Sequence, residues 1–274
     1  MATTDMESLV RRDRRIVLTC LVGITVLAWI FLVDMAIDMG GDVSGSVGDG
    51  ASLGGMFRGD AVAKPRAVTW GSVEFAIAFA MWAAMMMAMM LPTASPMVLM
   101  FATINRNQRR EDDAIVPTGV FVAGYIAIWV TFALAATLLQ WGFQSVGLIS
   151  PMMGKANAVF GGLVLFAAGI YQWTPLKDAC LRLCQTPLGF LMTRWRDGAV
   201  GAFRMGLSHG AFCVGCCWAL MLLMFAGGVM NLFWMALLTV FMLAEKIVPP
   251  GPWLPRAAGT ILIMWGGWVL GAAS

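Results

Sequence analysis

The sequence predicts an all-α fold, a polytopic bundle of about seven transmembrane helices with the N-terminus in the cytoplasm and the C-terminus outside. Composition is the first reason, because 60% of the residues are hydrophobic and 12% are charged, whereas about 25% of residues are charged in soluble domains. The second reason is a series of apolar stretches that are long enough, or nearly so, to cross a hydrocarbon core of about 30 Å as helices. The third is the distribution of basic residues along the chain.

The predicted spans are apolar runs bounded by polar, glycine or proline residues. The second run contains Pro92 and Pro96, each of which removes a backbone donor, so we expect this span to be broken. Only the glycine-containing residues 226–230 separate the fifth and sixth runs, which indicates a tight helical hairpin. In chain order the spans are Ile16–Val33, Val73–Met100, Pro117–Trp141, Asn157–Trp173, Met205–Phe225, Asn231–Ile247 and Ala257–Ala273.

The basic residues predict the orientation. With the N-terminus inside, the 18 Lys and Arg residues lie inside except for Arg58, Lys64, Arg66 and Lys155. An excess of Lys and Arg on the cytoplasmic side is the usual pattern in multi-pass proteins. The small net charge of +3 therefore reflects orientation, and we expect no nucleic-acid partner.

Two segments between the spans are expected to be loops. Residues 34–69 are rich in Gly, Ser and Asp and should form a flexible outer loop. Residues 174–204 should form a cytoplasmic loop that contains an amphipathic helix. Because no internal repeat is visible, we expect residues 1–274 to form a single integral membrane domain.

The most specific feature is the single histidine of the chain, which precedes three cysteines in the fifth predicted span. On a helix, His209, Cys213, Cys216 and Cys217 fall on one stripe about 100° wide. Buried thiols and an imidazole suit a soft metal ion. One ion cannot use all four groups, because eight residues separate His209 from Cys217 by about 12 Å along the axis. Packing stays open as the alternative, since a free cysteine often behaves as a small hydrophobe.

A second cysteine pair lies on the predicted amphipathic helix. Cys180 and Cys184 are four residues apart, so both thiols fall on one helical face. Neighbouring basic residues would favour thiolate, and a reducing cytosol would keep the pair unbridged. The pair could take an ion from a soluble carrier and relay it inward, or it could simply pack a surface helix.

Methionines gather in the second predicted span. The chain has 23 of them, and thioether sulfur is a soft ligand suited to Cu(I). We expect Met86, Met89 and Met90 to face the thiols across the bundle, and Met221 to continue the cysteine face of the fifth span as a relay. Methionine also fills irregular cores, so packing is the competing interpretation.

Glu245 ends the sixth predicted span next to Lys246. Ionisable residues near membrane depth often mark ligand or proton pathways. We therefore include Glu245 as a polar or proton site. The alternative is an interfacial anchor formed by the Glu-Lys pair at the end of the helix.

Three motifs together resemble a known family. They are Met85–Met97 with its two prolines, Lys177–Cys184, and the stretch from Gly206 to Lys246 that carries His209 and the three cysteines. This combination resembles a bacterial family of unknown function described as predicted metal-binding integral membrane proteins. The resemblance implies a metal-handling protein of the bacterial cytoplasmic (inner) membrane. One departure is Gln185, where a basic residue is expected in relatives.

These observations favour a protein that binds a metal ion, with copper preferred and zinc second. It would transport Cu(I) or deliver it to a membrane copper enzyme, with a soluble metal carrier or a copper-enzyme complex as its partner. One alternative is an accessory or scaffold subunit of a membrane oxidase or monooxygenase complex. Another is a membrane thiol redox enzyme that uses a quinone; outside that case we expect no catalytic residue. The oligomeric state stays open.

Overall fold

The computed structural model describes residues 2–38, 70–107, 118–149, 156–248, 251 and 253–273, with the side chains of residues 2–14, 38 and 107 excepted. Every regular element in these ranges is helical, apart from an isolated bridge between Ile149 and Ala156. The helices are α1 (Ala2–Asp38), α3 (Ser72–Asn107), α4 (Thr118–Ser145), α5 (Ala158–Tyr171), α6 (Pro175–Gln185), α7 (Pro187–Arg194), α8 (Gly198–Gly227), α9 (Leu232–Ile247) and α10 (Trp253–Ala273). The all-α fold is therefore confirmed.

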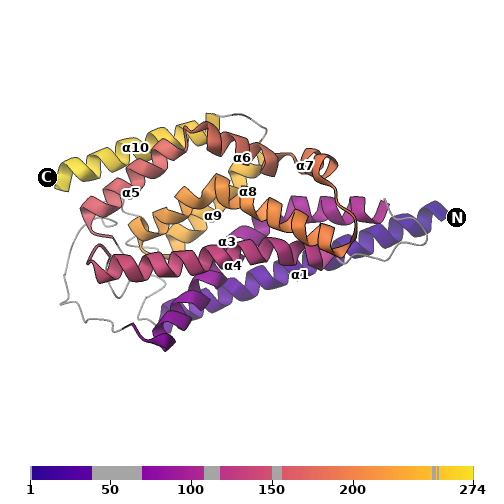
Figure 1. Cartoon of the computed structure of the whole chain (residues 1–274), viewed down its shortest axis with the longest axis horizontal. Helices are drawn as coiled ribbons and strands as arrows, with labels where there is room; N and C mark the ends of the chain where they lie inside the picture. The colour runs from indigo at the N-terminus through magenta and orange to yellow at the C-terminus, as the bar shows by residue number, and fades with distance from the viewer. Residues whose placement is uncertain are drawn as a thin grey trace.

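Four of the described helices are long and apolar enough to cross a membrane: α1, α3, α4 and α8. A fifth crossing is obtained if α5 and α6, which meet at a 68° bend, count as one broken span. Helix α9 has only 16 residues. The predicted count of seven is thus not confirmed. The predicted orientation stays a prediction, although α1 begins and α10 finishes at opposite ends of the long axis (Figure 1).

Helix α3 corrects the prediction of a broken second span. It runs without interruption for 36 residues through Pro92 and Pro96. A local hydroxyl group compensates for the donor missing at Pro96, since Ser95 Oγ donates at 2.8 Å to the Pro92 carbonyl, four residues before Pro96. A side-chain donor thus satisfies the carbonyl that Pro96 leaves free inside the bundle, and the helix continues past both prolines.

The two predicted loops differ from expectation where the structure describes them. Helix α1 extends through Asp38, so the beginning of the segment 34–69 is helical, while residues 39–69 lie outside the described ranges. The segment 174–204 contains α6, α7 and the first turns of α8. Thr174 accepts a hydrogen bond from the Lys177 amide and caps α6, and Pro175 occupies the first turn, which explains the sharp bend after α5.

Helix α8 is the structural centre of the described bundle and packs against α4, α5, α6 and α9 (Figure 1). Its approach to α4 depends on glycine. A Cβ atom at Gly206 would overlap the Phe121 backbone of α4, and one at Gly124 would overlap the Phe203 carbonyl of α8. Small residues allow such close backbone approach between membrane helices. The crossing holds the α4 residue Tyr125 against the cysteine face of α8.

Candidate metal centre

Helix α8 directs its three cysteines into the interior. Cys213, Cys216 and Cys217 are 0%, 2% and 1% exposed. The three-residue and four-residue spacings place all three on the helix side that faces α3 and α6, as the 3.6-residue period requires. None of the three is disulfide-bonded.

Cys213 contacts polar side chains of two other helices. Lys246 from α9 donates from Nζ to Cys213 Sγ at 3.0 Å and to Thr93 Oγ1 at 2.7 Å. The Tyr125 hydroxyl of α4 lies 3.3 Å from the same sulfur and 3.1 Å from the Met90 carbonyl that it bonds. The ammonium at hydrogen-bond distance stabilises negative charge on this sulfur.

The other two thiols of α8 donate back to their own helix. Cys216 Sγ and Cys217 Sγ both donate to the Cys213 carbonyl, at 3.1 and 2.8 Å. Cys217 Sγ also lies 4.0 Å from Met90 Sδ of α3. Thiol and thioether sulfur from two different helices are therefore in contact inside the bundle.

Helix α6 adds a further thiol to this group. The Cys184 thiol interacts with those of Cys213 and Cys216. Cys180, one turn earlier, packs on Gly215, where a Cβ atom would lie 2.8 Å from Cys180 Sγ. We call Cys184, Cys213, Cys216, Cys217 and Met90 the sulfur cluster.

The sulfur cluster is not arranged as a finished metal site. Among the described residues, no group of three or more His, Cys, Asp or Glu side chains lies in a geometry that could hold a metal ion. The hydrogen bonds explain this, because Cys216 and Cys217 donate their thiols to a carbonyl while the Lys246 ammonium donates to Cys213. Bound metal would have to replace these interactions.

The remaining predicted methionine ligands do not join the cluster in the same way. Met86, Met89 and Met221 are buried, with exposures of 0%, 0% and 1%. The described sulfur contacts reach Met90 but not these three, so their roles as ligands stay predictions. All three also belong to the apolar core, in the packing role that methionine commonly has.

His209 lies beside the cluster rather than within it. Its ring, 3% exposed, stacks on Tyr125 and Phe121 with centroid distances of 5.5 and 6.2 Å, and Phe190 of α7 approaches edge-on at 5.6 Å. Its Nδ1 atom is buried and has no hydrogen-bond partner in the described structure. The histidine faces a cavity that Cys184 also lines.

Glu245 is neither an exposed anchor nor a free acid. Its carboxylate accepts two hydrogen bonds from Lys177 Nζ, at 2.8 and 2.9 Å, with both side chains almost fully buried. Gln185 donates to the Glu245 backbone carbonyl at 2.7 Å. These contacts fasten α6, which carries Cys184, to α9, which carries Lys246. The interfacial-anchor interpretation of the Glu-Lys pair is therefore wrong.

Sequence reasoning missed three residues at the centre: Lys246, Tyr125 and Thr93. The ammonium that contacts Cys213 belongs to Lys246, whereas Lys177 of the segment 174–204 pairs with Glu245. A lysine at membrane depth is a sequence signal for a functional group. No sequence pattern shows which helix a tyrosine or threonine will meet.

Comparison with known proteins places the chain in a family. Nothing among curated proteins or solved structures matches it. A protein-family model described as PpoB2, copper chaperone, matches residues 79–269, which is more than half of the chain. The matched region contains every residue of the sulfur cluster together with His209, Lys246 and the Lys177–Glu245 pair. The chain therefore belongs to the PpoB2 copper chaperone family.

Proposed function

We propose that the protein is a membrane-embedded copper chaperone that binds Cu(I) at the sulfur cluster and passes it to a copper enzyme at the bacterial cytoplasmic membrane. The observation that carries this proposal is the convergence of thiol and thioether sulfur from α3, α6 and α8 at one buried place. Membership of a copper chaperone family supports a copper-handling role.

The donor set favours Cu(I) over zinc. Soft thiolate and thioether ligands select Cu(I), and Met90 contributes a thioether next to Cys217. Structural zinc is held by four Cys, His or carboxylate ligands in a closed tetrahedron. No such group is found in the described residues. A partial set of sulfur ligands that includes methionine fits Cu(I) better.

The hydrogen bonds of the cluster suit a protein that holds copper and then releases it. Without metal, Lys246 places a positive charge at Cys213, and two thiols bond a carbonyl instead of an ion. Binding of Cu(I) would replace the ammonium contact and turn the thiols inward. When the ion leaves, the same interactions re-form, which lowers the free energy of the metal-free state and favours release.

Copper content tests the proposal. The full chain is purified in detergent under reducing, anaerobic conditions, loaded with Cu(I), desalted and analysed for metal. We expect stoichiometric copper in the wild type and in Cys20→Ser, a control that removes an exposed thiol of α1. The Cys213→Ser/Cys217→Ser variant should lose this copper. Equal copper in the wild type and the double variant would refute the site.

Delivery and transport are separated by reconstitution. In vesicles that enclose a Cu(I) chelator, a transporter fills the lumen with copper, whereas a chaperone keeps it until an apo copper enzyme is added. We expect transfer to the enzyme without loading of the lumen. Luminal accumulation of copper would assign transport instead.

A second candidate, a thiol redox protein, is favoured by one specific contact. Cys184 of α6 interacts with Cys213 and Cys216 of α8, so thiols far apart in the sequence are neighbours in the bundle. This candidate requires that quinone reduction persists after copper is removed. Loss of all activity on copper removal would reject it and leave the chaperone proposal in place.

A further inference from the structure

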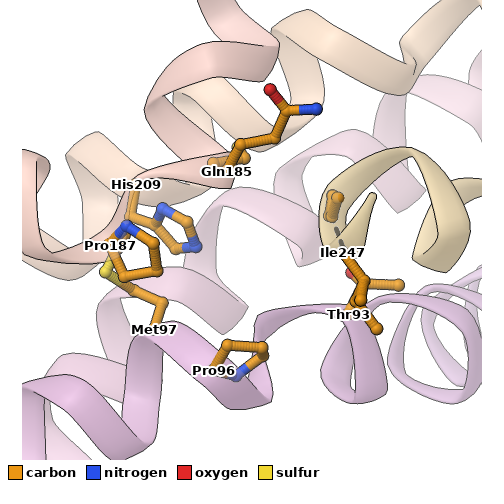
Figure 2. A pocket seen from close by; sticks show the side chains of 9 residues that line it. Thr93, Pro96, Met97, Gln185, Pro187, His209 and Ile247 are labelled. Carbon is orange, nitrogen blue, oxygen red and sulfur yellow. Dashed lines mark hydrogen bonds between the residues drawn. The ribbon is translucent and has the colours of Figure 1, made fainter. Parts of the chain in front are cut away.

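A cavity of about 250 Å³ lies next to the sulfur cluster, where α3, α6, α8 and α9 meet. Its walls include Met97, Pro187 and His209 on one side and Thr93 and Ile247 on the other, with Pro96 between them (Figure 2). Lys246 and Cys184 also line it. The cavity thus adjoins two groups that touch Cys213.

His209 lines this cavity and has one buried ring nitrogen, Nδ1, without a hydrogen-bond partner among the described residues. Its side chain is more than nine-tenths buried. Leaving a buried polar atom unsatisfied costs about 1–3 kcal/mol. A phenylalanine could stack on Tyr125 and Phe121 without that cost. At the wall of the cavity, the imidazole offers a nitrogen donor that a phenyl ring lacks, and the aromatic stack fixes the plane of the ring.

Two further soft donors line the same cavity. Met97 of α3 is 2% exposed and Cys184 of α6 is 8% exposed, and Figure 2 shows Met97 beside His209. Imidazole, thioether and thiol are all ligands that Cu(I) accepts. The cavity is smaller than the roughly 300–1,000 Å³ typical of pockets for drug-sized molecules. It suits an ion with small ligands and not an organic cofactor.

Cys184 connects the cavity to the sulfur cluster. It lines the cavity and also interacts with Cys213 and Cys216. Lys246, which also lines the cavity, bonds both Thr93 and Cys213. An ion held at the cavity is therefore one ligand exchange from Cys213, and the Lys246 ammonium must move aside as a second cation arrives.

We propose that His209, Met97 and Cys184 form an uptake site, which shares only Cys184 with the sulfur cluster, where Cu(I) binds first before it moves to Cys213. This inference rests on the proposed function and adds a second copper station to it. The ion stays Cu(I), so no electron is transferred. Bonds from copper to His209 and Met97 break as bonds to Cys213 and Cys217 form, the bond to the shared Cys184 is kept during the exchange, and the protons displaced from the thiols leave to solvent through the cavity.

Loading kinetics test the uptake site. Apo protein in detergent is mixed anaerobically with Cu(I) supplied as its glutathione complex, and both the rate of uptake and the final copper content are measured. His209→Phe keeps the aromatic stack but removes both nitrogens, and Met97→Leu removes sulfur at similar volume. Met100→Leu, one turn further along α3 and outside the cavity lining, is the matched control.

We expect both cavity variants to load about tenfold more slowly, which corresponds to about 1.4 kcal/mol in the barrier, and to reach the wild-type copper content. The Met100→Leu variant should load at the wild-type rate. Wild-type rates in both cavity variants would overturn the uptake site while leaving the sulfur cluster intact. Loss of final copper in His209→Phe would also overturn it, because His209 would then belong to the storage site. A wild-type chain that takes up no copper would instead refute the proposed function.

Discussion

The Lys177–Glu245 pair provides a sharp test of how the site is held together. Its two hydrogen bonds are 2.8 and 2.9 Å long, and the two side chains are 0% and 2% exposed. Removing one partner of such a pair strands a buried charge and costs about 3–5 kcal/mol, whereas replacing both with apolar residues is often neutral or stabilising. We therefore expect Lys177→Met and Glu245→Leu each to destabilise the protein by about 3–5 kcal/mol.

The double variant Lys177→Met/Glu245→Leu should recover most of this loss. Unfolding free energies of all four proteins are measured in the same detergent, and the coupling energy is taken from the double-mutant cycle. Since the pair fastens α6 to α9, each single variant should also bind less copper, and the double variant should regain it. Additive effects, or single losses under about 1 kcal/mol, would refute the role of the pair.

The remaining predictions concern helix packing and the ligands. Gly206→Ala should destabilise the protein by about 1–3 kcal/mol, because the added Cβ would overlap the backbone of α4. Gly142→Ala, on an open face of α4, should instead be neutral or stabilise the protein by about 0.5–1 kcal/mol. Thermal unfolding compares the two variants, and equal effects would contradict the close crossing of α4 and α8. Tyr125→Phe removes a hydrogen bond to Cys213 and should weaken Cu(I) affinity about 10-fold to 100-fold in a chelator competition, so an unchanged affinity would exclude the phenol from the site. Met90→Leu should weaken Cu(I) binding in the same competition while Met86→Leu leaves it unchanged, and the reverse order would assign the thioether ligand to Met86.

The helical fold could be predicted because it follows from local properties of the chain. Apolar runs and composition identify α1, α3, α4 and α8 without knowledge of their partners. The continuity of α3 through Pro92 and Pro96 could not be predicted, because no local pattern shows that Ser95 will donate to the carbonyl that Pro96 leaves free. The span count was also uncertain for a physical reason, since α5 and α9 are shorter than a full crossing.

The part of the candidate site that lies on α8 could be predicted from the sequence, but its contacts with other helices could not. The spacing of Cys213, Cys216 and Cys217 on α8 follows from helical periodicity alone. Their meeting with Cys184 and Lys246 depends on how α6 and α9 pack against α8, which no local pattern encodes. The sequence therefore indicates the sulfur ligands of α8 but not the ammonium that neighbours them.

X-ray absorption at the copper edge tests the central claim most directly, because it distinguishes sulfur from nitrogen or oxygen as the nearest neighbours of the bound ion. For the Cu(I)-loaded wild-type chain, we predict a nearest-neighbour shell dominated by sulfur, which disappears in Cys213→Ser/Cys217→Ser. A shell made only of nitrogen or oxygen would contradict the assignment of Cu(I) to the sulfur cluster.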